Sequence, residues 1–406
     1  MNESKYVKRT FYPIGHGAFY AERFHIDDAS RDYIIIFDCG CFEAAKPGVS
    51  SKDFEERIDE IINDAFAEGT IIDALFISHF HADHINGINH LMMRCNVKKV
   101  FIPKLSLSMV VETYLYYKDI GKDSSFGLFD RIIESEGKLI NDVPVIQIEA
   151  SDEVSISSSV ELESATEATM PSGGILTVNK IWKYIPYYVT STNDSNLVQD
   201  LRRELASCKK ILTGNLYEDS KIIKDFLESI GIEKCKRLYE KHYGKKHNCY
   251  SMTLLSKPYL CNGQCKKQCR KFGHNHMLCY AACLYMGDFD AANSANLENL
   301  KNFYTNHECW DNIGLIQVPH HGSENNYNEE LYAIPKFCMI SAGKTDFYEH
   351  PDNTTLINLY QKRCVPIIVT EDAKTKQEFF IDLSTTSLGD QQNLASASNN
   401  FNFEQL

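Results

Sequence analysis

Apolar positions in the first hundred residues are spaced in a way that predicts alternating strands and helices. Residues 51–69 carry apolar side chains at helical spacing, and Gly69 is typical of a helix end. In chain order, the predicted elements are strands 6–14 and 33–38, connected through a turn at 15–17, helix 51–69, strand 71–78, a helix from 83 to 93, and strand 97–102. This alternation indicates a layered α/β domain.

The rest of the chain divides into a less regular segment and a second run of clear elements. Residues 105–245 show weaker periodicity, with helix-like stretches at 106–120, 195–208 and 218–230 and strand-like ones at 143–148 and 178–190. We interpret this segment as an insertion or cap. Beyond it, the predicted elements are paired strands 250–255 and 278–286, helix 294–304, strands 313–318 and 336–341, helix 352–363, and strands 365–370 and 377–382. Residues 384–406, rich in Ser, Asn and Gln, are predicted to be a disordered tail.

Four side chains of metal-binding type follow the apolar run 71–78 within six residues. They are His79, His81, Asp83 and His84. Imidazole and carboxylate together suit zinc and neighbouring divalent ions. His79 and His81 alternate, so both rings can point to one side of an extended loop, while Asp83 and His84 lie where the next helix begins. The alternative, loop histidines with no ligand role, does not account for this density. The sequence predicts a loop in which two side chains reach one metal ion and two reach a second.

Further candidates stand after later strands, where active-site residues of α/β proteins usually lie. Asp288 follows one strand, His320 and His321 another, and His350 a third. A carboxylate such as Asp288 can lie between two cations, whereas taken singly Asp288 or His350 could equally be a solvated turn residue or a helix cap. Asn215 follows Gly214 as Asp288 follows Gly287, but a neutral amide bridges cations poorly. We therefore expect no role in the site for Asn215.

The pattern His-x-His-x-Asp-His resembles the metallo-beta-lactamase-fold hydrolases. The later motifs, in their order, resemble one subgroup, the soluble hydrolase domain of bacterial competence proteins that take up DNA and their stand-alone relatives. The matching segments are 14–19, 36–40, 78–87, 248–251, 287–288, 320–323, 341–343, 350–351 and 369–370. The resemblance implies an αββα sandwich, with residues 1–104 and 246–383 as the two halves of the hydrolase domain. The cap at 105–245 and a Cys/His-rich loop at 261–279 would be inserted into it.

The resemblance also implies roles for individual residues. His79 and His81 would bind one ion, Asp83 and His84 the other, Asp288 would bridge them, His321 would complete the second site, and Asp38 would orient a ligand histidine. The cofactor would be two zinc ions, with manganese as the alternative. His16 stands where the subgroup usually has Gln, and either His247 or Asn248 occupies the position of a further ligand in many relatives. Asp83 would orient the attacking water and take its proton, and His320 or His350 would neutralise charge on the substrate or protonate the leaving group.

A second group of metal-binding residues interrupts the strand pair 250–255 and 278–286. It consists of Cys261, Cys265, Cys269, His274, His276 and Cys279, followed by Cys283. A short loop without a core can fold around a structural zinc ion, which is the interpretation we prefer. The alternative is a set of free thiols partly buried in strands, and Cys283 fits it best.

Composition limits the function. Hydrophobic residues make up 43% of the 406, which is typical of a globular protein. The N-terminus lacks the apolar core of a signal peptide, and most of the 14 cysteines are scattered singly, so we expect a cytoplasmic protein with reduced thiols and no membrane partner. The net charge of −13 argues against general coating of nucleic acid, but residues 233–276 hold eleven Lys or Arg against two Glu. This basic segment could contact a nucleic-acid backbone, or could simply be a solvated face.

Three functions compete on these observations. The first is a metal-dependent phosphodiesterase or nuclease, which the competence-type resemblance and the basic segment favour. The second is a hydrolase of a small lactone, thioester or phosphate ester, for which an acidic surface is no handicap. The third is a metal-binding subunit without activity, which the complete ligand set disfavours. Fold resemblance cannot choose among substrates.

Overall fold

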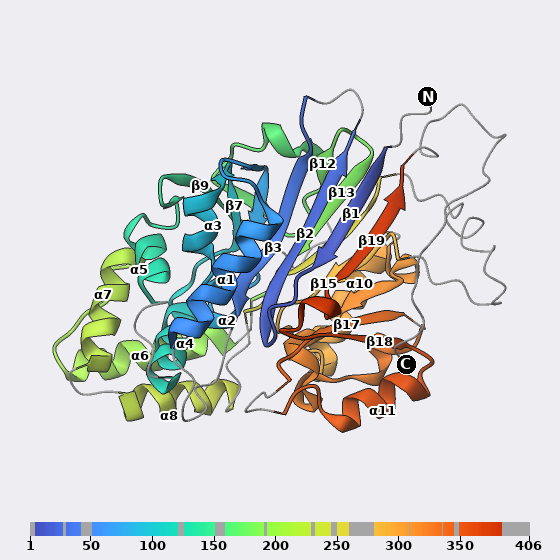
Figure 1. Ribbon diagram of the computed structural model, residues 1–406. Coiled ribbons are helices and arrows are strands. Elements are labelled where there is room, and N and C mark those ends of the chain that lie inside the picture. Colours follow the sequence, from blue (N-terminus) through green and yellow to red (C-terminus); the bar gives the residue numbers. More distant parts are fainter. Residues whose placement is uncertain are drawn as a thin grey trace.

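The computed structural model describes most of the chain. The described residues are 5–26, 30–41, 51–120, 126–150, 159–190, 193–228, 232–244, 250–259, 280–307, 309–334, 336–344 and 349–383. Two large sheets face each other and helices cover their outer faces, so the expected α/β sandwich is confirmed (Figure 1). Within the described residues, no helix is long and apolar enough to cross a membrane.

The first sheet contains the N-terminal strands and the last strand of the chain. Its order is β11-β9-β7-β5-β3-β2-β1-β19, with β8 paired to β9. The bounds are β1 Tyr6–Phe11, β2 Gly17–His25, β3 Tyr33–Cys41, β5 Ala74–Phe76, β7 Val100–Pro103, β8 Leu139–Ile140, β9 Val143–Glu149, β11 Thr169–Pro171 and β19 Gln377–Asp382. Strands β3, β5, β7 and β9 run parallel, so their carboxyl ends meet at one edge. A separate pair joins β4 (Ile71–Ile72) to β6 (Asn96–Val97).

The second sheet is built from the later strands in the order β10-β12-β13-β14-β15-β16-β17-β18. The bounds are β10 Val160–Glu161, β12 Leu176–Val178, β13 Trp182–Tyr187, β14 Thr253–Pro258, β15 Cys283–Tyr285, β16 Leu315–Gln317, β17 Phe337–Ser341 and β18 Val365–Val369. β14 and β15 are antiparallel partners, as the sequence predicted, while β15 to β18 run parallel. Asp288 and His321 therefore both follow strands that end at the same edge.

Helices lie outside the two sheets and in a group at one side (Figure 1). α1 (Ser51–Ala65) and α3 (Ile88–Arg94) pack on the first sheet, and α10 (Ser294–Asn306) and α11 (Asn353–Gln361) on the second. The remaining long helices are α4 (Leu107–Ile120), α5 (Phe126–Glu134), α6 (Asn193–Ser207), α7 (Leu216–Phe226) and α8 (Ile232–Tyr243). These five belong to the segment 105–245 and pack on one another.

A buried polar network joins the two sheets among aromatic side chains. Arg9 of β1 and Glu22 of β2 are buried and form an ion pair of 2.6 Å. Glu22 also accepts hydrogen bonds from the hydroxyls of Tyr184 (2.5 Å), Tyr285 (2.9 Å) and Ser256 (2.7 Å), all on the second sheet. Every charge in the network thus has a partner, as a buried ion pair requires.

The sequence missed several elements, among them α5 and α8 of the segment 105–245. The chain between 6–11 and 33–41 forms β2, so three antiparallel strands stand where two were predicted. The predicted helix from 83 to 93 is two short helices, α2 (Ala82–Ile85) and α3, because the Gly87 N–H donates to the Cys39 carbonyl of β3 (2.9 Å). This contact ties the break between the helices to the first sheet.

Candidate metal centre

The loop between β5 and α2 holds the first motif. Ser78 fixes it in two directions, because its N–H donates to Asp38 Oδ1 (2.6 Å) and its carbonyl accepts from the Met252 N–H (2.9 Å). The four motif residues are no more than 6% exposed: His79, His81, Asp83 and His84. Polar side chains are seldom buried this deeply without strong partners.

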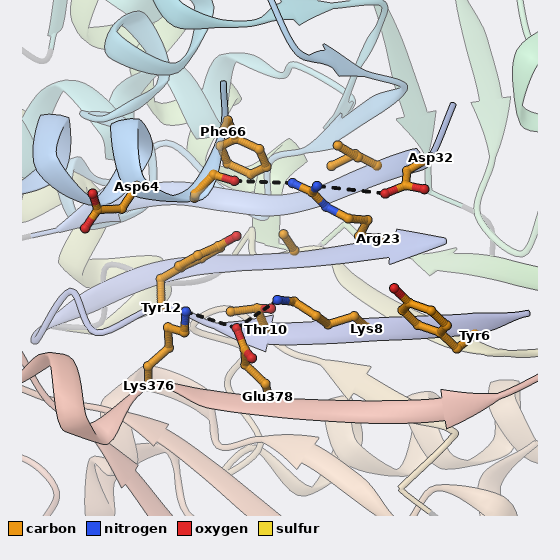
Figure 2. Close-up of a pocket in the computed structure, with 13 residues that line it drawn as sticks. Tyr6, Lys8, Thr10, Tyr12, Arg23, Asp32, Asp64, Phe66, Lys376 and Glu378 are labelled. Atoms are coloured by element: carbon orange, nitrogen blue, oxygen red, sulfur yellow. Dashed lines mark hydrogen bonds and ion pairs between the residues drawn. The ribbon is translucent and has the colours of Figure 1, made fainter. Parts of the chain in front are cut away.

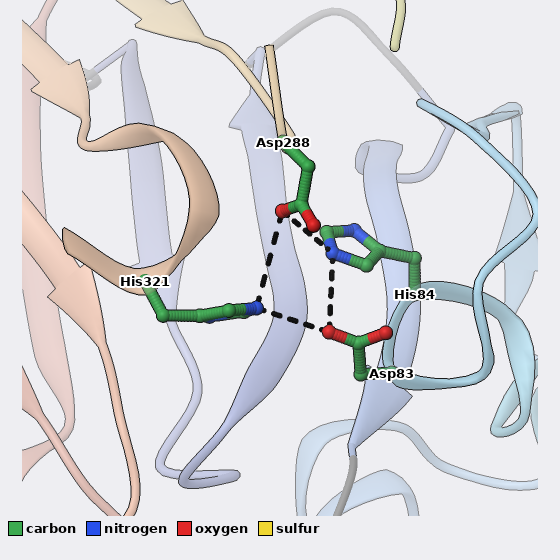
Figure 3. Close-up of side chains that lie close together, drawn as sticks. All are labelled: Asp83, His84, Asp288 and His321. Atoms are coloured by element: carbon green, nitrogen blue, oxygen red, sulfur yellow. Dashed lines mark hydrogen bonds and ion pairs between the residues drawn. The ribbon is translucent and has the colours of Figure 1, made fainter. Parts of the chain in front are cut away.

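Asp288 and His321 reach this loop from the second sheet (Figure 3). Gly287 holds Asp288 in place, since the N–H groups of Met286 and Gly287 both donate to Gln317 Oε1 (2.7 Å each). Atoms able to bind an ion form two groups, and within each group they lie within 4.8 Å of one another: Asp83, His84, Asp288 and His321 in one, and His79, His81 and Asp288 in the other. Asp288 is shared by both groups. The grouping coincides with the ligand sets that the resemblance implied, and ion binding by them stays a prediction.

Hydrogen bonds outside the cluster fix the rings of its two most buried histidines. His84 Nδ1 lies 2.8 Å from Asp38 Oδ2, and His321 Nδ1 donates to the Ser341 carbonyl (2.9 Å). Because a carbonyl only accepts, the proton of a neutral His321 is on Nδ1. Its Nε2 then presents a lone pair to Asp83 Oδ2, 3.0 Å away. A lone pair facing a carboxylate at this distance needs a proton or a cation between them.

The other two histidines are fixed in the same way. His79 Nδ1 is 3.0 Å from Ser78 Oγ, and His81 Nε2 is 3.0 Å from Glu112 Oε1. Carboxylates and hydroxyls that hold the far nitrogen of an imidazole are the usual support of a metal ligand. Each of the four rings therefore has one nitrogen anchored outside the cluster.

The donor set fits divalent cations. The Nε2 atoms of His79 and His84 are buried and make no hydrogen bond to any described residue. Burial alone would raise the pKa of Asp83, but the neighbouring His84 and His321 hold this pKa well below its usual range. Burial, with the neighbouring imidazoles, lowers the pKa of His79 well below its usual value. Burial opposes the charge of His84 and His321, but the carboxylates of Asp83 and Asp288 raise the pKa of both rings, so a metal ion bound there would replace a proton.

Three residues of the site other than glycine have positive φ. Asp38, His320 and His321 have φ values of 53°, 50° and 55°. For residues other than glycine such conformations cost about 1–3 kcal/mol and persist where the surrounding contacts enforce them. Here the hydrogen bonds of Asp38 and His321 provide those contacts.

Gly40 lets β3 approach the motif loop, and we expect Gly40→Ala to disturb the centre. A Cβ at Gly40 would lie 2.6 Å from backbone atoms of Asp83 and His84. Overpacking of this kind costs about 1–3 kcal/mol, and backbone atoms cannot move aside cheaply. Thermal unfolding and metal content of the purified variant measure the effect. Gly127→Ala is the control, because its Cβ would be 3.7 Å from the nearest heavy atom, in the flexible Arg131 side chain. A Gly40→Ala variant with unchanged stability and metal content would contradict the argument.

Three imidazoles surround the cluster on its more exposed side. The His16 ring lies 3.9 Å from the His321 ring, centroid to centroid, and its Nε2 is 3.7 Å from Asp83 Oδ2. His320 Nδ1 lies 3.0 Å from Asn326 Oδ1, and the His320 side chain is 32% exposed. The His350 ring is 5.9 Å from that of His320 and 6.1 Å from that of His16. These three histidines, His16, His320 and His350, are called the rim histidines below.

Sequence reasoning missed several residues of the site. Glu112 and Tyr116, from the segment interpreted as a cap, contact His81, and no local motif marks them. Ser78 directly precedes the motif in sequence, and a hydroxyl next to a metal-binding histidine could have been predicted to hold that ring by a hydrogen bond. Asn215, which we expected to be outside the site, caps α7 by accepting a hydrogen bond from the Glu218 N–H (3.0 Å).

Other predicted residues lie outside the described residues: His247, Asn248, Cys261, Cys265, Cys269, His274, His276 and Cys279. The predictions of a disordered tail at 384–406 and of a structural zinc ion fall there too. Cys283 is described, and it is a buried free thiol of β15 whose pKa burial raises to about 12.

The described ends of the Cys/His-rich segment lie away from the metal centre. β14 starts beside Ser78 and runs for six residues, about 20 Å of strand, before Tyr259. β15 returns from that end toward Asp288. In α8, Lys241 pairs with Asp200 (2.6 Å) and Lys234 with Glu204, both on α6. The described part of the basic segment is thus partly neutralised by carboxylates of α6.

A separate groove of about 270 Å³ lies on the outer face of the first sheet (Figure 2). It is lined by residues of β1, β2, β19 and the end of α1, and none of them belongs to the metal centre. Its charges pair with one another: Glu378 binds Lys8 and Lys376 (3.0 Å each), and Arg23 donates to the Ala65 carbonyl (3.2 Å). This pairing leaves little charge for a ligand.

Comparison with known proteins gives a family match in the first part of the chain. Residues 27–150, which include the motif loop, match the model of the metallo-beta-lactamase superfamily. Ribonuclease J of Mycoplasma genitalium is 27% identical over 107 residues, and ribonuclease J of Mycoplasma pneumoniae is 28% identical over 88 residues. These matches cover 26% and 22% of this chain but only 18% and 15% of the two relatives.

A solved structure also aligns over nearly the whole chain. The structure of unliganded yeast PDE1 covers 93% of this chain and 99% of its own, at 10% sequence identity and a TM-score of 0.39. A TM-score this low indicates only a loose overall correspondence of elements.

Proposed function

We propose that this metal-dependent hydrolase of the metallo-beta-lactamase fold is a phosphodiesterase or nuclease with two metal ions. The observation that carries the proposal is the pair of buried ligand groups that share Asp288. Two cations a few ångströms apart can stabilise both the attacking and the leaving oxygen of a phosphodiester. A single carboxylate common to both groups supports such a spacing.

The residues in and around the cluster have different roles in the proposed reaction. When bound, divalent ions acidify a water molecule and polarise the bond under attack. Asp83 is held by His321 on one oxygen and orients the attacking water, whose proton it accepts. His320, fixed by Asn326, stands at the opening and protonates the departing oxygen or binds the charge of the phosphate, with His350 next to it.

The surroundings of the cluster support a narrow substrate. The ligand residues are almost completely buried, and His320 is the most exposed of the rim histidines. We expect a site with ligands this deeply buried to admit a single strand or a strand end rather than a duplex. The ribonuclease J similarity favours a nucleic acid, and residues 233–276 remain a candidate contact for its backbone. Helices α4 to α8 of the segment 105–245 would border the path of the strand.

A hydrolase of small esters is the second candidate, and the net charge of −13 favours it. Metal analysis followed by assays on single-stranded RNA, DNA, duplexes, bis(p-nitrophenyl) phosphate and lactones, with zinc or manganese added, separates the two. Cleavage of strands, with binding that weakens as salt rises, supports the nuclease. Cleavage of lactones alone would replace it with the small-ester function.

Replacing each rim histidine by asparagine tests the protonating role. We expect His320→Asn to slow cleavage of a nucleic-acid strand by about 10²–10⁴-fold, the usual contribution of a general acid. Hydrolysis of bis(p-nitrophenyl) phosphate should change far less, because p-nitrophenolate departs without a proton. His350→Asn is the matched variant at the same rim. Equal losses on both substrates would instead assign His320 to binding the phosphate charge.

A further inference from the structure

Helix α4 of the segment 105–245 holds the metal-binding loop by three side chains. Glu112 contacts His81, the Tyr116 hydroxyl accepts a hydrogen bond from the Ala82 N–H (3.3 Å), and the Tyr117 hydroxyl donates to the Phe80 carbonyl (2.9 Å). Two successive turns of this helix thus contact three consecutive residues of the motif loop.

The Glu112 contact decides which nitrogen of His81 faces the cluster. Glu112 Oε1 lies 3.0 Å from His81 Nε2, and both side chains are 5% exposed. A carboxylate is an acceptor, so a neutral His81 carries its proton on Nε2 and keeps the lone pair on Nδ1. Carboxylates in this position are the usual support that orients a metal-binding histidine.

Tyr116 fixes the plane of the same ring. The two rings stack with centroids 3.7 Å apart and an angle of 10° between their planes. The Glu112 contact at one nitrogen and the Tyr116 ring on one face together restrict the rotation and the tilt of the His81 imidazole ring. The orientation of this ligand is set from α4.

The position of α4 depends in turn on the other helices of the segment. α4 packs on α6, α7 and α8. Asp194 of α6 accepts hydrogen bonds from Tyr243 of α8 and from Tyr250 (2.7 Å), which precedes β14. These contacts connect the helical group to the sheet that carries Asp288.

We propose that Glu112 is a positioning residue for the ion site formed by His79, His81 and Asp288, and that the segment 105–245 completes this site. The segment is then a structural part of the metal centre, and the second site, of Asp83, His84, Asp288 and His321, is independent of it. The inference deepens the proposed function and rests on it only for the presence of two ions.

Binding of Mn²⁺ alone, followed by electron paramagnetic resonance of the free ion, tests the inference without a substrate. Manganese suits imidazole and carboxylate and avoids competition from thiolates. The parent should bind two ions. In Glu112→Gln and Glu112→Ala, one ion should bind as in the parent and the other about 10- to 100-fold more weakly, the usual effect of removing a partner of a metal-binding histidine.

Tyr114→Phe is the matched control on the same helix, because the Tyr114 hydroxyl donates to Asp130 of α5 (3.2 Å). It should leave both affinities unchanged. Thermal unfolding of metal-free protein shows whether each variant folds, and Glu112→Gln keeps the shape of the side chain if Glu112→Ala does not fold. Unchanged binding of both ions, or equal weakening of both, would overturn the inference. A parent that binds no Mn²⁺ would remove the two-ion function, and this inference with it.

Discussion

Asp288→Ala is expected to abolish hydrolysis while leaving the protein folded. Asp288 is the one residue common to both groups of ligand atoms among the described residues, so its loss removes a ligand from each. If roughly 4 kcal/mol or more of transition-state stabilisation depends on the ions, the rate should fall by at least about 10³-fold. Steady-state hydrolysis of bis(p-nitrophenyl) phosphate and the metal content of the variant measure the effect.

Two variants control this result. Asn215→Ala changes the residue that imitates Asp288 in sequence but caps α7, so it should cost about 1 kcal/mol of stability and leave hydrolysis intact. Asp83→Asn should also abolish hydrolysis, because the amide neither accepts the proton of the water nor carries the charge of the carboxylate. Full activity in Asp288→Ala would remove the bridging role. Inactivity with both ions still bound would show that Asp288 acts on the substrate instead.

Glu22→Gln is expected to lower the free energy of unfolding by about 3–5 kcal/mol, the usual result of removing one partner of a buried ion pair. The substitution leaves the Arg9 guanidinium charged and buried between the sheets. Arg9 also donates to the carbonyls of Tyr280 (2.6 Å) and Ala281 (3.1 Å), so it cannot turn toward water without breaking these contacts. Urea denaturation of metal-free protein measures the change.

The neighbouring residue of the same strand provides the control. Lys8 pairs with Glu378 (3.0 Å) in a partly exposed position of the groove. Glu378→Gln makes the same chemical change as Glu22→Gln, but in solvent, and should cost no more than about 1 kcal/mol. If the two variants lose the same stability, burial is not the reason for the strength of the Arg9–Glu22 pair.

Local sequence determined most of the elements of the two halves of the sandwich. Helices 51–65, 294–306 and 353–361 and most strands follow from periodicity, because each of these elements buries one face or a continuous apolar run. β2 escaped prediction. The sequence predicted a single turn at 15–17 between two strands, because Gly15 and Gly17 are typical turn residues. In the structure, β2 starts at Gly17 and continues for nine residues. The short strands of 159–178 carry too few residues for a period to show.

Metal binding by the motif loop could likewise be predicted from the sequence, because four side chains of metal-binding type within six residues rarely occur together unless they bind a metal ion. Asp288, His320, His321 and His350 could be proposed because they follow predicted strands, and parallel strands bring their ends to one edge. The resemblance implied that Asp288 bridges two ions, and the tertiary structure brings it into both groups of atoms, which depends on the distance between the ends of two different sheets.

What the sequence by itself determined is therefore the type of fold, the residues that can bind metal ions and the reaction class that they imply. The tertiary structure decided the support of these residues and the place of the inserted segments. Glu112 and Tyr116 act on His81 from 31 and 35 positions away in the chain, without any local pattern, because helix packing alone brings them there. The Cys/His-rich segment shortly precedes Asp288 in sequence, yet a strand rises about 3.3 Å per residue, and this length places the described residues that flank the segment, Tyr259 and Tyr280, at the far end of β14 and β15.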